Sequence, residues 1–67
     1  MTKFCVAYVD FFDNELTQKV VEATNEMDAV VVAGHATTEE KQSWSNIEEM
    51  EQYFFDGDSL ISVIELQ

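Results

Sequence analysis

The sequence predicts a small α+β domain in which helices cover one face of a single antiparallel or mixed sheet. Three observations lead to this prediction. Apolar runs rich in β-branched and aromatic residues, typical of strands, lie near the two ends, at residues 3–12 and 59–66. The segment between them carries polar capping residues and apolar residues at helical spacing. A chain of 67 residues, 46% of them hydrophobic, makes one compact domain, residues 1–67.

The first predicted strand, residues 3–12, is apolar on both faces. Alternation places Phe4, Val6 and Tyr8 on one face and Cys5, Ala7 and Val9 on the other. This pattern predicts a central strand that is covered on both sides. Since Cys5 is the only cysteine and sits in an apolar run, we expect it to be a small buried hydrophobe and not a reactive thiol.

The next segment has two interpretations. In the first, residues 15–23 form a second strand, paired with the first through a turn at Asp13 and Asn14. A helix then runs from about residue 26 to residue 33. Its signals are Thr24 or Asn25 as N-cap, Glu26 and Asp28 in the first turn, Met27, Val30 and Val31 as a buried stripe, and Gly34 as a left-handed stop.

In the second interpretation, Asp13 caps a helix that runs to about Met27. Apolar residues recur there at helical spacing, at Leu16, Val20, Ala23 and Met27. Residues 30–32, three valines, would then be a parallel strand, because β-branched residues are poor helix formers. We favour the first interpretation, because its helix has a start and a stop signal in the right places.

The second half of the chain predicts a loop, a helix and a strand. Residues 35–43 are polar and predict a loop or a frayed continuation of the preceding helix. The helix begins at a Ser45 or Asn46 cap and ends near Phe55; its core-facing residues are Ile47, Met50 and Phe54. An Asp-Gly-Asp turn leads into the last strand, residues 59–66. The predicted order is a β-hairpin, two helices and a final strand (ββααβ), with βαβαβ as the alternative.

The charge of the chain excludes several classes of function. It carries 14 Asp and Glu against 3 Lys and Arg, a formal net charge of -11. Such a domain repels nucleic acid and anionic membranes and attracts basic protein surfaces, so we expect neither direct nucleic-acid binding nor membrane association. No apolar run approaches the roughly 20 residues of a membrane span, and no signal peptide is recognisable. We therefore expect a cytoplasmic protein.

No catalytic or metal-binding pattern stands out. His35 is the only histidine, and the two glycines, Gly34 and Gly57, stand alone, so neither a metal cluster nor a phosphate-binding loop is indicated. The Asp56-Gly57-Asp58 stretch lacks the twelve-residue ligand pattern of a calcium loop and predicts a turn. We therefore predict no enzymatic activity, no cofactor and no bound metal.

Two features remain as candidate binding surfaces. Carboxylates crowd the second predicted helix and its following turn, at Glu48, Glu49, Glu51, Asp56 and Asp58. They are either a solvated face or an imitation of a phosphate backbone for a basic groove. The chain also has eight aromatic residues, 12% of its length, which is many for so small a core. Either they are partly buried or some form a contact patch, for which Trp44 and Tyr53 are the best candidates.

In size, acidity and general layout the chain resembles the small early proteins with which bacteriophages inhibit host machinery. Some of those are acidic DNA mimics or inhibitors of host polymerases and nucleases. The resemblance implies a non-enzymatic binding protein that inhibits or regulates a basic, nucleic-acid-handling host protein, with DNA mimicry as one means. It rests on overall character and assigns no residue. The alternative is a small homodimeric structural or accessory module whose acidity serves only solubility.

Overall fold

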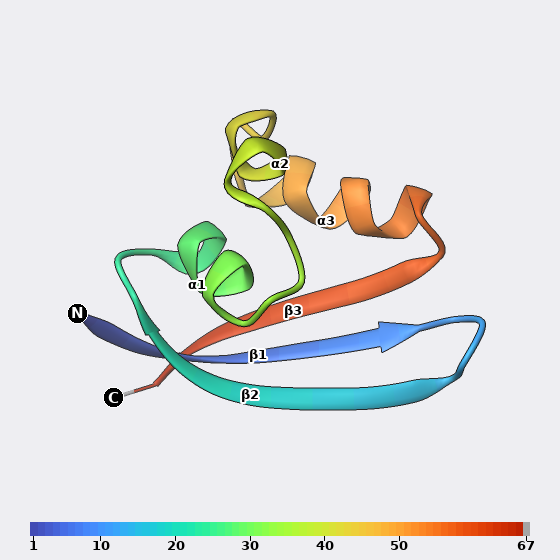
Figure 1. Ribbon diagram of the computed structural model, residues 1–67, viewed down its shortest axis with the longest axis horizontal. Helices are drawn as coiled ribbons and strands as arrows, with labels where there is room; N and C mark the ends of the chain where they lie inside the picture. The colour runs from blue at the N-terminus through green and yellow to red at the C-terminus, as the bar shows by residue number, and fades with distance from the viewer. Residues whose placement is uncertain (67) are drawn as a thin grey trace.

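The computed structural model describes residues 1–66, and within this range three helices lie on one face of a three-stranded antiparallel sheet (Figure 1). The elements are β1 (Thr2–Asp10), β2 (Glu15–Ala23), α1 (Glu26–Val32), α2 (Thr38–Gln42), α3 (Ile47–Asp56) and β3 (Ser59–Leu66). The strand order is β2-β1-β3, so β1 is central. This confirms the α+β class and the hairpin interpretation, whereas the βαβαβ alternative is wrong.

The β1–β2 hairpin pairs nine residues, from Thr2 with Ala23 to Asp10 with Glu15. At its turn the Asn14 N–H donates to the carbonyl oxygen of Asp10 at 2.7 Å. Asn14 has a φ of 56°, a left-handed conformation that asparagine tolerates better than most residues. The side chain of Asp10 accepts a hydrogen bond from the Phe12 N–H at 2.8 Å. The predicted Asp-Asn turn therefore forms, with Asn14 as its strained residue.

The helix boundaries follow from side-chain caps. Asn25 and Asn46 cap α1 and α3, and Gly34 ends the α1 segment with a φ of 90°, as predicted. The loop predicted for residues 35–43 is wrong over Thr38–Gln42, where α2 forms. Thr37 and Glu40 cap this helix reciprocally in a capping box. The spacing of that pair was the sequence signal for α2.

The core lies between the sheet and the helices. Its buried residues are Phe4, Val6, Ala23, Ala29, Val30, Ala33, Trp44, Met50, Phe54 and Ile61. The predicted stripe of α3 is confirmed, because Met50 and Phe54 are buried and Ile47 packs against them. On α1, Val30 is buried as predicted, but Ala29 and Ala33 complete the buried side and Val31 is only half-buried.

The prediction that β1 is covered on both sides is wrong. Its even-numbered face, with Phe4 and Val6, is buried beneath the helices, but no helix of residues 1–66 covers the other face of the sheet (Figure 1). Cys5, expected in the core, is therefore only half-buried. The chain leads all three helices back over the same side of the sheet, which leaves the second apolar face of β1 without a layer of its own.

His35 packs on the aromatic ring of Tyr8 at the edge of the core. The two rings stack with centroids 4.5 Å apart, and within residues 1–66 the buried Nε2 of His35 has no hydrogen-bond partner. Burial, and secondarily the nearby Lys19 ammonium, lowers the pKa of His35. Lys19 is held there by donating to the carbonyl oxygen of Ala33 at 2.9 Å. The fold therefore favours the neutral imidazole.

We expect this histidine to make the fold less stable as the pH falls. Because its pKa is lower in the folded state, the unfolded chain binds more protons below about pH 6.5, and the histidine's contribution to stability is lost as pH falls through the folded-state value. The substitution His35→Phe keeps an aromatic ring against Tyr8 and removes the titration. Urea unfolding at about pH 8 and pH 5 should show wild type losing stability relative to His35→Phe on acidification. A difference that stays constant with pH would contradict this.

Candidate acidic binding surface

The candidate site is the acidic surface, which we define as the carboxylates of α3 and the turn after it: Glu48, Glu49, Glu51, Asp56 and Asp58. All five residues are exposed. The packing of α3 places them there, because its apolar stripe at Met50 and Phe54 is held in the core and turns the remaining positions outward. The structure therefore presents every acidic residue of the predicted site to solvent.

The three glutamates at the start of α3 do not form one line. Residues in an α-helix follow one another by about 100°, so Glu49 and Glu51 lie about 200° apart, on opposite flanks of α3. Glu48 lies close to the side opposite Met50. A flat partner surface can therefore contact Glu48 together with one flank, but not both flanks at once.

Some of these carboxylates already have partners within the fold. Glu49 accepts from the Ser45 N–H at 3.0 Å, and Asp56 accepts from the side-chain amide of Gln52 at 2.7 Å. Glu49 thus satisfies a backbone donor just before the helix, besides lying in the positive first turn of α3. Within residues 1–66 the carboxylates of Glu48, Glu51 and Asp58 have no hydrogen-bond partner, so they are the members best able to meet another protein.

Lysine side chains compensate little of the negative charge. Lys41 pairs with Asp28, the only ion pair within residues 1–66. Lys19 is engaged with a backbone carbonyl, and Lys3 lies in the sheet, opposite Glu22. The acidic surface itself has no cation bound to it in the described part of the chain. Its electrostatic potential therefore remains strongly negative and available to a basic partner.

A carboxylate of α2 is tied to α3 beside the acidic surface. The hydroxyl of Tyr53 donates to Glu40, which also accepts from the Thr37 N–H at 3.0 Å. The Tyr53 hydrogen bond, followed by the contacts with Thr37, lowers the pKa of Glu40, and the same bond raises the pKa of Tyr53. Tyr53 is 43% exposed, so its ring edge is accessible although its hydroxyl is engaged.

Trp44, expected at an exposed contact patch, lies instead in the core. Its side chain is 7% exposed and packs against Tyr53 and Phe54, with ring centroids 5.5 and 5.9 Å away. The indole Nε1 is buried and has no partner within residues 1–66. Trp44 therefore offers almost no surface to another protein; it fixes α3 to the segment that follows α2.

Besides Tyr53, three exposed aromatic residues lie at or near the far end of α3. Phe11, Phe12 and Phe55 are all exposed, and the rings of Phe11 and Phe55 meet edge to face at 6.4 Å. The Phe11 N–H donates to the carbonyl oxygen of Asp58 at 3.0 Å, which joins the hairpin turn to the end of the acidic surface. The sequence showed an excess of aromatic residues, but only the tertiary structure places Phe11 beside Phe55 and Asp58.

The chemistry of this surface is that of electrostatic contact. Within residues 1–66 no group of three or more His, Cys, Asp or Glu side chains is arranged to hold a metal ion. No helix in this range is long and apolar enough to cross a membrane. Four of the carboxylates lie on α3 and Asp58 lies in the turn after it, all exposed, an arrangement suited to lysine and arginine side chains of a partner.

The link between Tyr53 and Glu40 can be tested by titration. Replacing Tyr53 with Phe removes the donor, so the pKa of Glu40 should rise toward that of an ordinary glutamate. The measurement is the pH dependence of the Glu40 carboxyl carbon shift by NMR, in wild type and in Tyr53→Phe. Tyr8→Phe serves as the control, since it removes a hydroxyl elsewhere. A Glu40 titration that is the same in all three proteins would refute the hydrogen bond.

Comparison of the chain with family models, with curated proteins and with solved structures finds no match.

Proposed function

We propose that this protein is a non-enzymatic acidic binding protein. In this proposal it acts in the cytoplasm, where its acidic surface binds a basic, nucleic-acid-handling protein and inhibits or regulates it by occupying the site for nucleic acid. It binds neither nucleic acid nor membrane directly. A bacterial host protein is the expected target, in keeping with the resemblance to bacteriophage early proteins.

The observation that carries this proposal is the uncompensated charge on one side of the fold. Of the 14 acidic residues, the strand register places Glu22 alone on the uncovered face of the sheet; the others lie on the helices, the turns or the helix side of the strands. Within residues 1–66 a single ion pair, Lys41 with Asp28, neutralises one of these acidic residues. A field of one sign concentrated on one side favours fast encounter with a basic surface.

The spacing of the carboxylates supports competition with nucleic acid. From Glu48 to Asp56 four carboxylates follow one another over about 12 Å of α3, at a helical rise of about 1.5 Å per residue, and Asp58 follows in the turn. One strand of duplex DNA carries a phosphate about every 3.4 Å along the axis, or three to four over the same distance. Counted around the whole helix, the acidic surface therefore resembles one strand in charge density, although a flat partner contacts Glu48 together with only one flank of α3. It falls short of the whole duplex, which carries twice as many charges.

The exposed aromatic residues supply a contact of another kind. Phe11 and Phe55 adjoin the Asp58 end of the acidic surface, and the exposed Phe12 follows Phe11 in the hairpin turn. Buried aromatic anchors contribute most of the affinity in many protein interfaces, while charged rims mainly accelerate association. We infer that a partner which contacts Asp58 also covers these rings.

Capture from a bacterial lysate tests the partner class. The tagged protein should retain basic proteins at about 0.1 M NaCl and release them at about 1 M NaCl, where the Debye length falls from about 10 Å to about 3 Å. Duplex DNA added at low salt should displace the same proteins. Retention that survives high salt and is not displaced by DNA would overturn the proposal.

Charge reversal locates the contact. In Glu48→Lys/Glu51→Lys both carboxylates are exposed and unpaired, so each change should alter stability by less than about 0.5 kcal/mol. Glu49 is left intact, because it bonds the Ser45 N–H. Association with the captured partner should slow at least about tenfold and depend less on salt.

The matched control is Glu15→Lys/Glu65→Lys, which reverses two exposed glutamates on the strands. Both variants change the net charge equally, so a general loss of steering would slow association with either one. Surface-based kinetics should show the larger effect for the α3 variant. Equal rates for the two variants would show that the acidic surface is only solvated.

A further inference from the structure

The sheet face opposite the helices is apolar and exposed. The register brings twelve residues to this uncovered sheet face in four cross-strand rows: Glu22, Lys3 and Leu66; Val20, Cys5 and Ile64; Gln18, Ala7 and Ser62; Leu16, Val9 and Leu60. Val20 and Ile64 are 64% and 60% exposed, and Leu16 and Leu60 are also among the exposed large hydrophobics. An apolar patch that runs across all three strands marks an interaction site.

We propose that a second copy of this chain covers the uncovered sheet face, so that the protein is a homodimer with its two sheets packed face to face. The inference is independent of the proposed function, since it uses the opposite side of the molecule. The helices, with the acidic surface, would form the outer layers of the dimer.

The charge on this face favours a second copy over a basic partner. Lys3 and Glu22 are its only charged residues, and they lie directly opposite each other on β1 and β2. The face is therefore neutral, although the chain carries a net charge of -11. A two-fold interface brings a surface against itself, so it must be free of uncompensated charge. A cationic partner would find a single carboxylate here, Glu22, with the ammonium-bearing Lys3 opposite it.

The repulsion between two acidic chains does not prevent this arrangement. Packed sheets lie about 10 Å apart, and each helical layer lies farther out on its own side. The acidic surfaces of the two copies are then separated by both sheets, well beyond the Debye length of about 8 Å at physiological salt.

The area of the face agrees with the lower limit for a specific dimer. Three strands of eight or nine residues, about 4.8 Å apart with a rise of about 3.4 Å, have a footprint of roughly 400 Å². Two such faces remove roughly 800 Å² of flat area from water, and the relief of the side chains brings the accessible area to the ~1,000 Å² that a biological interface needs. For so small a chain, this second core adds substantially to the first.

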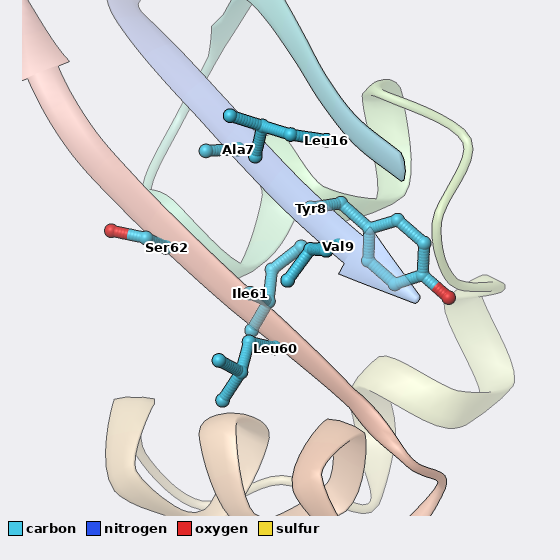
Figure 2. Close-up of a pocket in the computed structure, with 7 residues that line it drawn as sticks. All are labelled: Ala7, Tyr8, Val9, Leu16, Leu60, Ile61 and Ser62. Carbon is cyan, nitrogen blue, oxygen red and sulfur yellow. The ribbon is translucent and has the colours of Figure 1, made fainter. Parts of the chain in front are cut away.

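The shape of the face is suited to interdigitation. Its third row contains Gln18 and the small side chains of Ala7 and Ser62, and the rows on either side carry Val, Ile and Leu together with Cys5. A hollow of about 230 Å³ results, lined by Ala7, Val9, Leu16, Leu60 and Ser62, which Figure 2 shows along the three strands, and by parts of Tyr8 and Ile61. Leu16 and Leu60 form a ridge beside this hollow. In a dimer, the leucine ridge of one copy can insert into the hollow of the other.

Sedimentation equilibrium tests the dimer directly. At about 100 μM protein we expect twice the 7.7 kDa of one chain. The dimer should be at least as tight at about 1 M NaCl as at about 0.1 M, since salt screens the repulsion between two acidic chains. The proposed function predicts the opposite salt dependence for a basic partner, so each proposal can fail without the other.

Val20→Lys should weaken the dimer at least about a hundredfold, because it leaves a charge buried and unpaired in the interface. Val20 is 64% exposed in the single chain, so the fold should persist, as circular dichroism can verify. Val32→Lys is the matched control: it makes the same change at a valine that is 57% exposed, but on α1. Both variants reduce the net negative charge, so repulsion cannot explain a loss of dimer.

Thiol labelling provides a second readout, because Cys5 lies in the covered area. Its labelling should slow as protein concentration rises in wild type and in Val32→Lys, but not in Val20→Lys. A wild-type chain that stays monomeric, or a dimer that Val20→Lys leaves intact, would overturn the proposal. The proposal would also be overturned if the chain captured a different protein and Val20→Lys, but not Val32→Lys, abolished that capture. The uncovered sheet face would then bind that protein and not a second copy.

Discussion

Strand β1 is apolar on both of its faces, and the rest of the molecule depends on that constraint. As the central strand it pairs with β2 and β3, so its side chains define both surfaces of the sheet. Phe4 and Val6 belong to the core beneath the helices, while Cys5, Ala7 and Val9 lie on the other side. Three short helices on one side complete one core only. A second core is available only if another molecule supplies it.

The acidic residues are arranged so that they oppose the fold less than their number suggests. Six of them lie in the first turns of the helices: Glu26, Asp28, Glu39, Glu40, Glu48 and Glu49. There they meet the positive ends of the helix dipoles, and Glu40 and Glu49 also satisfy backbone N–H groups. Only one carboxylate among residues 1–66, Glu22, lies on the uncovered sheet face, opposite Lys3. The acidic residues in the first turns therefore stabilise the helices and also place much of the negative charge on the helix side of the molecule.

The molecule therefore has two surfaces that differ in charge and in the expected salt dependence of their contacts. The helix side is charged, and its contacts should weaken with salt; the sheet side is neutral and apolar, and its contacts should not. Because they lie on opposite layers of the fold, both can be occupied at once. A dimer built on the sheet would carry two outward-facing acidic surfaces. A partner with two basic sites would then bind with an affinity raised by effective concentration, provided that its sites match the spacing.

Local signals in the sequence determined most of the elements: alternating apolar residues for β1 and β3, the Asp-Asn turn for the hairpin, and the caps at Asn25 and Asn46. The exposure of the acidic surface also followed from sequence, because carboxylates at helix positions outside an apolar stripe turn toward solvent. Only the tertiary structure decided the rest. It buried Trp44, brought Phe11 and Phe55 together beside Asp58, and left one face of the sheet bare. These outcomes depend on contacts between distant segments, and periodicity shows which residues are apolar but not which of them another layer will cover.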